Sequence, residues 1–268
     1  MKSKSGLTGA FAGFAAIVIP VLFVVAFVLY FFVMGNPQNF QGNNVNNLPK
    51  PGNYLGTIYK GGYIVPILMT ILMMVITFTI ERFITLTRAK GKGRIPSFVV
   101  KVYQKISDGS LDSAISECDN QKGSVANVIK AGLLKYKSVV TNKEMNKDQK
   151  IVAIKQEIEE ATSLELPMLE QNLVILATIA PLATLMGLLG TVLGMIRAFA
   201  ALATAGAPDA VALATGISEA LINTAFGIGS SALAIIFYNY FTTKIDKMTY
   251  SIDEAGVAIV QNFSAHQQ

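Results

Sequence analysis

Four long apolar segments constrain this chain more than any other feature of its sequence. They cover residues 10–34, 61–80, 171–196 and 210–243, and only the last contains a charged residue. Each reaches the length of about 20 residues that a helix needs to cross a ~30 Å hydrocarbon core. Of the 39 Lys, Arg, Asp and Glu residues, 27 lie instead in 81–170. The sequence therefore predicts an all-α integral membrane protein with four transmembrane helices and one charged, helical insert. It excludes a single soluble domain, a disulfide-rich secreted fold and a disordered chain.

The first segment has a competing interpretation as a cleaved signal peptide. Lys2 and Lys4 supply the positive start that such a peptide requires. However, the apolar run is much longer than the usual core of about 7–15 residues, and no A-x-A-like cleavage site follows it. We therefore expect a retained N-terminal transmembrane helix.

The distribution of Lys and Arg predicts the orientation of the spans. Residues 81–170 contain 15 of them, whereas the loop 35–60 has only Lys50 and Lys60 and residues 198–209 have none. Positive residues are retained on the cytoplasmic side of a membrane. Both termini and the insert are therefore expected in the cytoplasm, with the two short loops outside.

The two segments between the first three spans have different characters. The loop 35–60 is rich in Asn, Gly and Pro and is expected to be an irregular linker. In the insert, apolar residues such as Ile154 and Ile158 recur at helical spacing. One helix is expected to begin at about Lys147 and to continue into the third span, with a bend near Pro167. The insert is too small, and has too few apolar residues, to be interpreted as an enzyme domain.

Small residues gather on one face of the third span. Gly187, Gly190, Thr191 and Gly194 follow the spacing i, i+3, i+4 and i+7. Small residues let membrane helices approach closely, so the first interpretation is tight helix packing, extending to a homo-oligomer. The second interpretation is a narrow polar lumen, with hydroxyls supplied by Thr178, Thr184 and Thr191.

Glu219 is the exceptional residue of the fourth span. A charge at the centre of a bilayer costs about 2.5–3.5 kcal/mol on insertion scales, so such residues usually mark an ion path or a partner. The alternative is a solvated position near the outer interface. Glu219 shares one helical stripe with Asn223 and Ser230, and Thr224 and Gly227 lie on a second stripe. Thr224 is about 140° around the helix from Glu219, so both can face one spot only if neighbouring subunits contribute them.

The sequence lacks the usual signs of an enzyme or a cofactor site. The single cysteine, Cys118, cannot form an internal disulfide, and the single histidine, His266, lies near the C-terminus. Together they cannot build a usual zinc site, and no Walker A motif is present. We expect no catalytic residue, no metal, no cofactor and no nucleic-acid partner.

Two long motifs resemble a known family. The third span reads APLATLMGLLGTVLGMIRAF, and the fourth reads GISEALINTAFGIGSSALAIIFYNYF. These segments, covering about 177–241, resemble the MotA/TolQ/ExbB proton-channel family, and specifically its ExbB/TolQ branch. The shared motifs are G-L-x-G-T-V-x-G-M, I-x-E-A-L-x-x-T-A-x-G and Y-N-x-F, and they occur in that order.

The resemblance implies a homopentamer in the bacterial inner membrane whose last two spans line a central lumen. An ExbD-like single-span subunit would occupy that lumen as a dimer and carry the titrating carboxylate. Proton-motive force would become mechanical work that a TonB-like protein delivers to outer-membrane import. Thr191 and Thr224 match the family's lumen threonines and Glu219 its lumen glutamate. The expected ion pathway and helix-packing positions are Thr184, Thr191, Glu219, Asn223 and Thr224, with Gly187, Gly190, Gly194 and Gly227.

The expected organisation follows from these assignments. It is an extra transmembrane helix at 1–34, a periplasmic linker at 35–60, a transmembrane helix at 61–80, a cytoplasmic insert at 81–170, a lumen-lining helix at 171–203, a periplasmic turn at 204–209, a lumen-lining helix at 210–243 and a cytoplasmic tail at 244–268.

Several alternatives stay open. ExbB and TolQ usually have three spans, whereas MotA has four, so a TolQ-like or MotA-like stator for envelope maintenance or motility is the alternative function. A secondary transporter would need a substrate site and usually an internal repeat, and neither is visible. A purely structural scaffold does not explain Glu219. The sequence leaves the coupling ion open.

Overall fold

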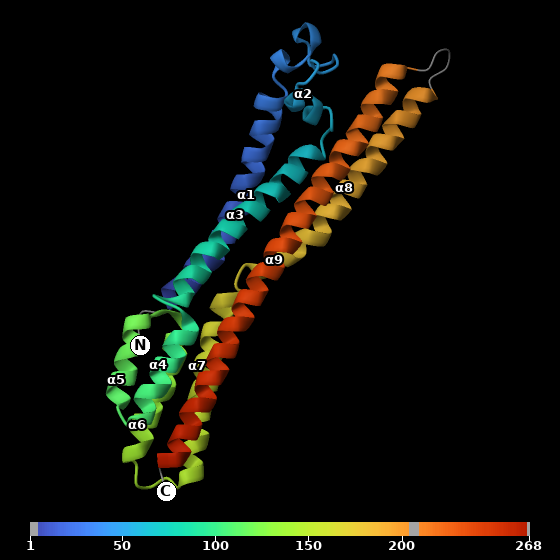
Figure 1. The fold of residues 1–268 in the computed structure, drawn as a ribbon. Coiled ribbons are helices and arrows are strands. Elements are labelled where there is room, and N and C mark those ends of the chain that lie inside the picture. Colours follow the sequence, from blue (N-terminus) through green and yellow to red (C-terminus); the bar gives the residue numbers. More distant parts are fainter. Residues whose placement is uncertain (1–4, 204–208, 267–268) are drawn as a thin grey trace. The chain divides into compact units, whose positions relative to one another are not determined.

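The chain is helical throughout most of the residues that the structure, a computed structural model, describes: 5–203 and 209–266. It divides into two compact units, Met1–Ile80 with Val174–Tyr238 and Glu81–Leu173 with Asn239–Gln268 (Figure 1). Within the described ranges, four helices are long and apolar enough to cross a membrane, in agreement with the four expected apolar helices. Of the expected segments, residues 1–4 and 204–208 lie outside the described residues.

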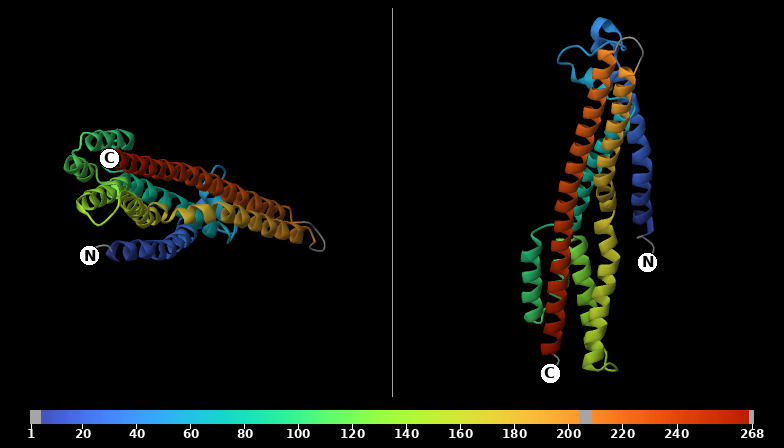
Figure 2. Two further views of the ribbon diagram at one scale, coloured as in Figure 1. Left: turned by 90° about the horizontal axis from the view of Figure 1, so that it is seen from below. Right: turned by 90° about the vertical axis from the view of Figure 1, so that its right-hand side faces the viewer.

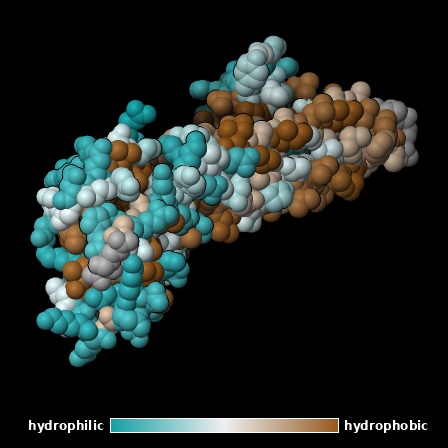
Figure 3. All heavy atoms as spheres, turned by 60° about the horizontal axis from the view of Figure 1, so that its bottom comes forward, coloured by the Kyte–Doolittle hydropathy of each residue, from teal (hydrophilic) through white to brown (hydrophobic). Residues whose placement is uncertain are grey.

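The first unit contains the apolar parts of the four long helices. The helices are α1 (Ser5–Val28) with a π-helical continuation (Leu29–Met34), α3 (Val65–Lys90), α8 (Leu173–Leu202) and α9 (Ala210–His266). Hydrophobic residues dominate the visible surface of this unit, whereas hydrophilic residues dominate that of the second (Figure 3). Phe32, for example, is 75% exposed. Exposed apolar area of this extent suits a hydrocarbon environment.

The loop after the first span is held together by asparagine side chains. Asn39 donates from Nδ2 to the carbonyls of Val33 and Met34, at 2.8 and 2.9 Å, which satisfies the end of the π-helix. Its Oδ1 accepts a hydrogen bond of 3.0 Å from Asn53, the N-cap of α2 (Tyr54–Tyr59). The expected irregular linker is therefore a compact structure with a short helix, because its amides replace missing backbone partners.

Tyr30 joins this region to the core of the first unit. Its hydroxyl donates to the carbonyl of Tyr59 at 2.9 Å, and the two rings stack with centroids 4.7 Å apart. Ala26, Val65 and Met69 form the buried cluster around Tyr30. The first span thus packs against the beginning of α3 through fully buried side chains.

The second unit is a helical bundle. It contains α4 (Ile95–Ser107), α5 (Leu111–Gln121), α6 (Gly123–Thr141), α7 (Lys147–Glu170), the end of α3 and the C-terminal part of α9 (Figure 2). All of these helices contribute apolar side chains to its core, including Leu86, Phe98, Val102, Ala114, Ile129, Leu133, Ile154, Ile259 and Phe263. Arg82 is fully buried here and donates to both carboxylate oxygens of Glu81 and to the carbonyl of Leu169.

Two boundaries differ from those expected. Pro167 lies inside α7, and the helix is interrupted later, at Gln171 and Asn172, before α8 begins. Asn172 has a φ of 61°, a left-handed conformation that asparagine tolerates better than most residues. The fourth long helix does not end near residue 243 but continues to His266, because the end of an apolar segment does not require the end of a helix.

Candidate functional site

Helices α8 and α9 form an antiparallel hairpin whose backbones touch (Figures 1 and 2). A Cβ atom on Gly187 would lie 3.0 Å from Gly227 Cα, and one on Gly194 would lie 2.7 Å from the backbone nitrogen of Ala220. Such distances leave no room for a side chain. The small-residue face is therefore occupied by the second helix of the same chain.

A pair of threonine hydroxyls bridges the hairpin. Thr191 Oγ1 lies within hydrogen-bonding distance of Thr224 Oγ1. Each hydroxyl also reaches a carbonyl of its own helix, Gly187 for Thr191 at 3.1 Å and Ala220 for Thr224 at 2.9 Å. Both threonines are only half-buried, so the pair forms a polar position that other molecules can still approach.

Glu219 forms an ion pair across the same hairpin. Its two carboxylate oxygens lie 2.5 and 2.7 Å from Nη1 of Arg197. The side chain of Glu219 is 4% exposed and that of Arg197 is 51% exposed. The carboxylate is thus neutralised within its own chain, and it is the guanidinium that reaches the surface.

Asn223 connects the hairpin to the beginning of α3. It is fully buried, and its Nδ2 donates to the carbonyl of Gly61 at 2.9 Å. Among the described residues, neither its Oδ1 nor Ser230 Oγ on the same stripe of α9 has a hydrogen-bond partner. Buried polar atoms without partners are uncommon, and both of these atoms can still take part in a hydrogen bond. Thr184, the remaining expected pathway residue, is half-buried on α8.

The structure therefore separates the expected site residues into two groups. Thr184, Thr191 and Thr224 keep partial access to the surface, whereas Glu219 and Asn223 point into the protomer. Large apolar side chains cover the outward faces of the hairpin, among them Leu185, Leu188, Val192 and Ile196 on α8 and Ile217, Leu221, Ile228 and Ile235 on α9. The threonine pair is thus a polar group of the hairpin that keeps partial access to the surface.

Arg197 is the residue that sequence reasoning missed. In the sequence, Arg197 is only the charged residue that ends the third apolar segment. Its pairing with Glu219 depends on the register of the hairpin, which the sequence does not give. Gly194 opposite Ala220 and Gly187 opposite Gly227 fix that register. It brings position 197 next to position 219, where charges of opposite sign meet.

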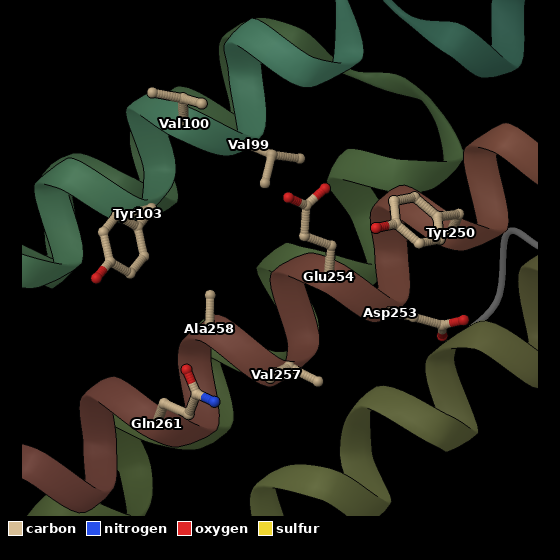
Figure 4. Close-up of a pocket in the computed structure, with 9 residues that line it drawn as sticks. All are labelled: Val99, Val100, Tyr103, Tyr250, Asp253, Glu254, Val257, Ala258 and Gln261. Atoms are coloured by element: carbon tan, nitrogen blue, oxygen red, sulfur yellow. The ribbon is translucent and has the colours of Figure 1, made fainter.

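A separate groove lies in the second unit, between α4 and α9 (Figure 4). It has a volume of about 540 Å³ and is lined by Val99, Val100, Tyr103, Tyr250, Asp253, Glu254, Val257, Ala258 and Gln261. Its walls are mainly apolar and aromatic, with two carboxylates from one turn of α9. It shares no residue with the polar positions of the hairpin.

The structure also locates the single cysteine and the potential metal ligands of the described residues. Cys118 is buried, and burial raises the pKa of its thiol to about 12, with a further contribution from the Asp119 carboxylate. The reactive thiolate is therefore scarce near neutral pH. Within residues 5–203 and 209–266, no three His, Cys, Asp or Glu side chains are grouped so that they could hold a metal ion.

Comparisons with known proteins point to one family. The sequence model of the MotA/TolQ/ExbB proton channel family matches residues 120–254. The Tol-Pal system protein TolQ of Pseudomonas aeruginosa is 27% identical over 158 residues, 59% of this chain and 68% of that protein. The biopolymer transport protein ExbB-like 3 of Synechocystis is 38% identical over 86 residues, 31% of this chain and 41% of that protein. ExbB of Pseudomonas putida is 27% identical over 161 residues, 60% of this chain and 48% of that protein. This chain thus spans less than half the length of these two ExbB-named relatives.

Proposed function

This chain belongs to the MotA/TolQ/ExbB proton channel family, and on that premise we propose that it is an ExbB-like subunit of an inner-membrane, proton-driven motor. With an ExbD-like partner, it converts proton-motive force into mechanical work for TonB-dependent import across the outer membrane. The observation that carries the proposal is the family match over 120–254, which includes both helices of the hairpin with Thr191, Thr224 and Glu219.

The proposed assembly is a homopentamer around an ExbD-like dimer, with a TonB-like protein receiving the work. The apolar outward surface of the hairpin supports contacts with lipid and with other subunits. The half-buried threonine pair supports a polar path next to the partner's titrating carboxylate. We further propose that the chain catalyses no covalent reaction and that protons are the coupling ions.

A second function is favoured by particular observations. Relatives named TolQ match this chain over 59% and 72% of its length, which supports a TolQ-like role in envelope maintenance as well as the ExbB-like role. The four long apolar helices match the span count of MotA and extend the alternative to a motility stator.

Deletion of the gene distinguishes these roles. We expect the deletion strain to lose growth on an iron complex that enters through a TonB-dependent receptor, and a plasmid copy to restore it. Detergent sensitivity with normal iron uptake would favour the TolQ-like role, and loss of swimming would favour the MotA-like role. A strain unaffected in all three assays would contradict the proposal.

Cysteine labelling tests the proposed orientation, with the loop outside and residues 81–170 in the cytoplasm. In a Cys118→Ala background, we expect Asn44→Cys to react with an impermeant thiol reagent once the outer membrane is permeabilised. Glu144→Cys should react only after the inner membrane is opened. Both positions are exposed, whereas Cys118 is itself a poor reporter, because burial raises the pKa of its thiol to about 12. The reverse labelling pattern would overturn the orientation.

A further inference from the structure

We propose that Arg197 is a positioning residue that holds Glu219 as a fixed carboxylate against the Gly61–Gly62 turn. The Arg197–Glu219 pair then acts as a latch that fastens the beginning of α3 to the α8–α9 hairpin. The latch rests on contacts within this chain, and only its consequence for proton movement rests on the proposed function.

The carboxylate of Glu219 is held from two sides. On one side, Nη1 of Arg197 lies 2.5 and 2.7 Å from its two oxygens. On the other side stands Gly62, where a Cβ atom would lie 2.8 Å from the Glu219 carboxyl carbon and 3.1 Å from Arg197 Nη1. The ion pair therefore occupies the space that a side chain at position 62 would need.

Gly62 is suited to this contact by its backbone as well. Its φ is +78°, a left-handed conformation that glycine adopts without the steric cost of a side chain. The turn is closed by hydrogen bonds of 2.9 Å from Gly61 N to Ile58 O and 3.2 Å from Gly62 N to Tyr59 O. The turn presents a bare backbone to Glu219, and the carboxylate packs directly on it.

Asn223 provides a second connection to the same turn, one helical turn from Glu219. Its Nδ2 donates to the carbonyl of Gly61 at 2.9 Å. The amide fits there because position 190 of α8 is glycine, where a Cβ atom would lie 2.5 Å from Asn223 Cγ. Two side chains of α9, Glu219 and Asn223, thus contact two successive residues of the Gly61–Gly62 turn.

The two partners of the latch differ in exposure, and this predicts unequal effects of removing them. Without Arg197, the carboxylate of Glu219 loses its counter-charge, and burial of an unpaired carboxylate favours the neutral form. Without Glu219, the half-exposed guanidinium of Arg197 can extend toward polar surroundings. Removing the cation alone is therefore more damaging than removing the anion or both charges.

The latch changes the role of Glu219 in the proposed motor. The carboxylate of Glu219 is held by an arginine and packs on a turn, so its contacts are those of a structural anchor. Proton transfer would then pass by the threonine pair, and Glu219 would set the position of α3 beside it. Glu219 would then have a structural role, whereas the threonine pair would provide the polar group at the surface of the hairpin.

The test uses the purified full-length chain in detergent without any partner, in the variants Arg197→Gln, Glu219→Gln and the double variant. We expect Arg197→Gln to lower the thermal midpoint most, and the added Glu219→Gln to recover much of that loss. Infrared spectra at neutral pH should contain a protonated-carboxyl band in Arg197→Gln that is absent from the wild type and the double variant. Lys137→Gln, which removes an exposed ion pair with Asp112, should leave both readouts unchanged.

Two outcomes would overturn the latch. One is additivity, with the double variant less stable than Arg197→Gln by the full effect of Glu219→Gln. The other is an unchanged infrared spectrum in Arg197→Gln. Because no partner or uptake is involved, a chain with the latch signature but without a motor phenotype would contradict the proposed function and leave the latch intact.

Discussion

Replacement of Gly190 by leucine is expected to prevent the α8–α9 hairpin from closing, so that little folded protein accumulates in the membrane. A Cβ atom at this position would lie 2.5 and 2.7 Å from Cγ and Nδ2 of Asn223. Leucine would therefore displace Asn223 and break its hydrogen bond to Gly61. Overpacking typically costs 1–3 kcal/mol and an unsatisfied buried polar group about 1–3 kcal/mol more, which is a large part of the stability of an ordinary domain.

The matched control is a second glycine in the same hairpin. A Cβ atom on Gly229 would meet nothing within 4 Å, so Gly229→Leu should fold and accumulate like the wild type. The measurement is the yield of monodisperse protein after detergent extraction, by fluorescence-detected size-exclusion chromatography. Equal yields of Gly190→Leu and Gly229→Leu would show that the close approach of α8 and α9 does not hold the hairpin together.

Removal of both hydroxyls of the threonine pair is expected to abolish energy-dependent uptake while the protein accumulates normally. In the Thr191→Val, Thr224→Val double variant the shape of each side chain is retained, but the polar contact between the two helices is lost. Each unit charge that crosses the membrane gains about 2.3 kcal/mol per 100 mV. A motor can capture this energy only along a path with polar groups, and the valine pair interrupts that path.

The control for the threonine pair lies on the same helix. Thr178 is exposed, and its hydroxyl donates to the carbonyl of Val174 within α8. Thr178→Val should therefore grow normally on an iron source that needs TonB-dependent import. If the double variant also grows normally at equal abundance, the threonines serve helix packing alone.

The spans and the family were predictable from the sequence because each depends on local information. The described part of the chain contains four helices of sufficient length and apolarity, as length and composition predict. The resemblance carried by the third and fourth spans is confirmed by the family match over 120–254. Neither conclusion requires knowledge of which residues face one another.

The contacts of the site depend on register, which the sequence leaves open. The lumen position expected for Glu219 stays a prediction, and within the chain its carboxylate contacts Arg197 and the Gly61–Gly62 turn. That turn is more than 150 residues away in the sequence, and no periodicity in α9 refers to it. The small-residue face raised a similar ambiguity, because close packing within a chain and between copies uses the same pattern.

Proton flux in a reconstituted system tests whether this chain forms a proton-driven motor with a single-span partner. The chain and the ExbD-like subunit proposed as its partner would be co-purified and reconstituted into liposomes that contain a pH-sensitive dye. A potassium gradient with valinomycin would set the membrane potential. We predict proton influx that depends on the potential, requires both proteins, and is lost in the Thr191→Val, Thr224→Val double variant but kept in Thr178→Val. A flux that stays at the level of empty liposomes with both folded proteins present, or that is unchanged in the double variant, would contradict the account.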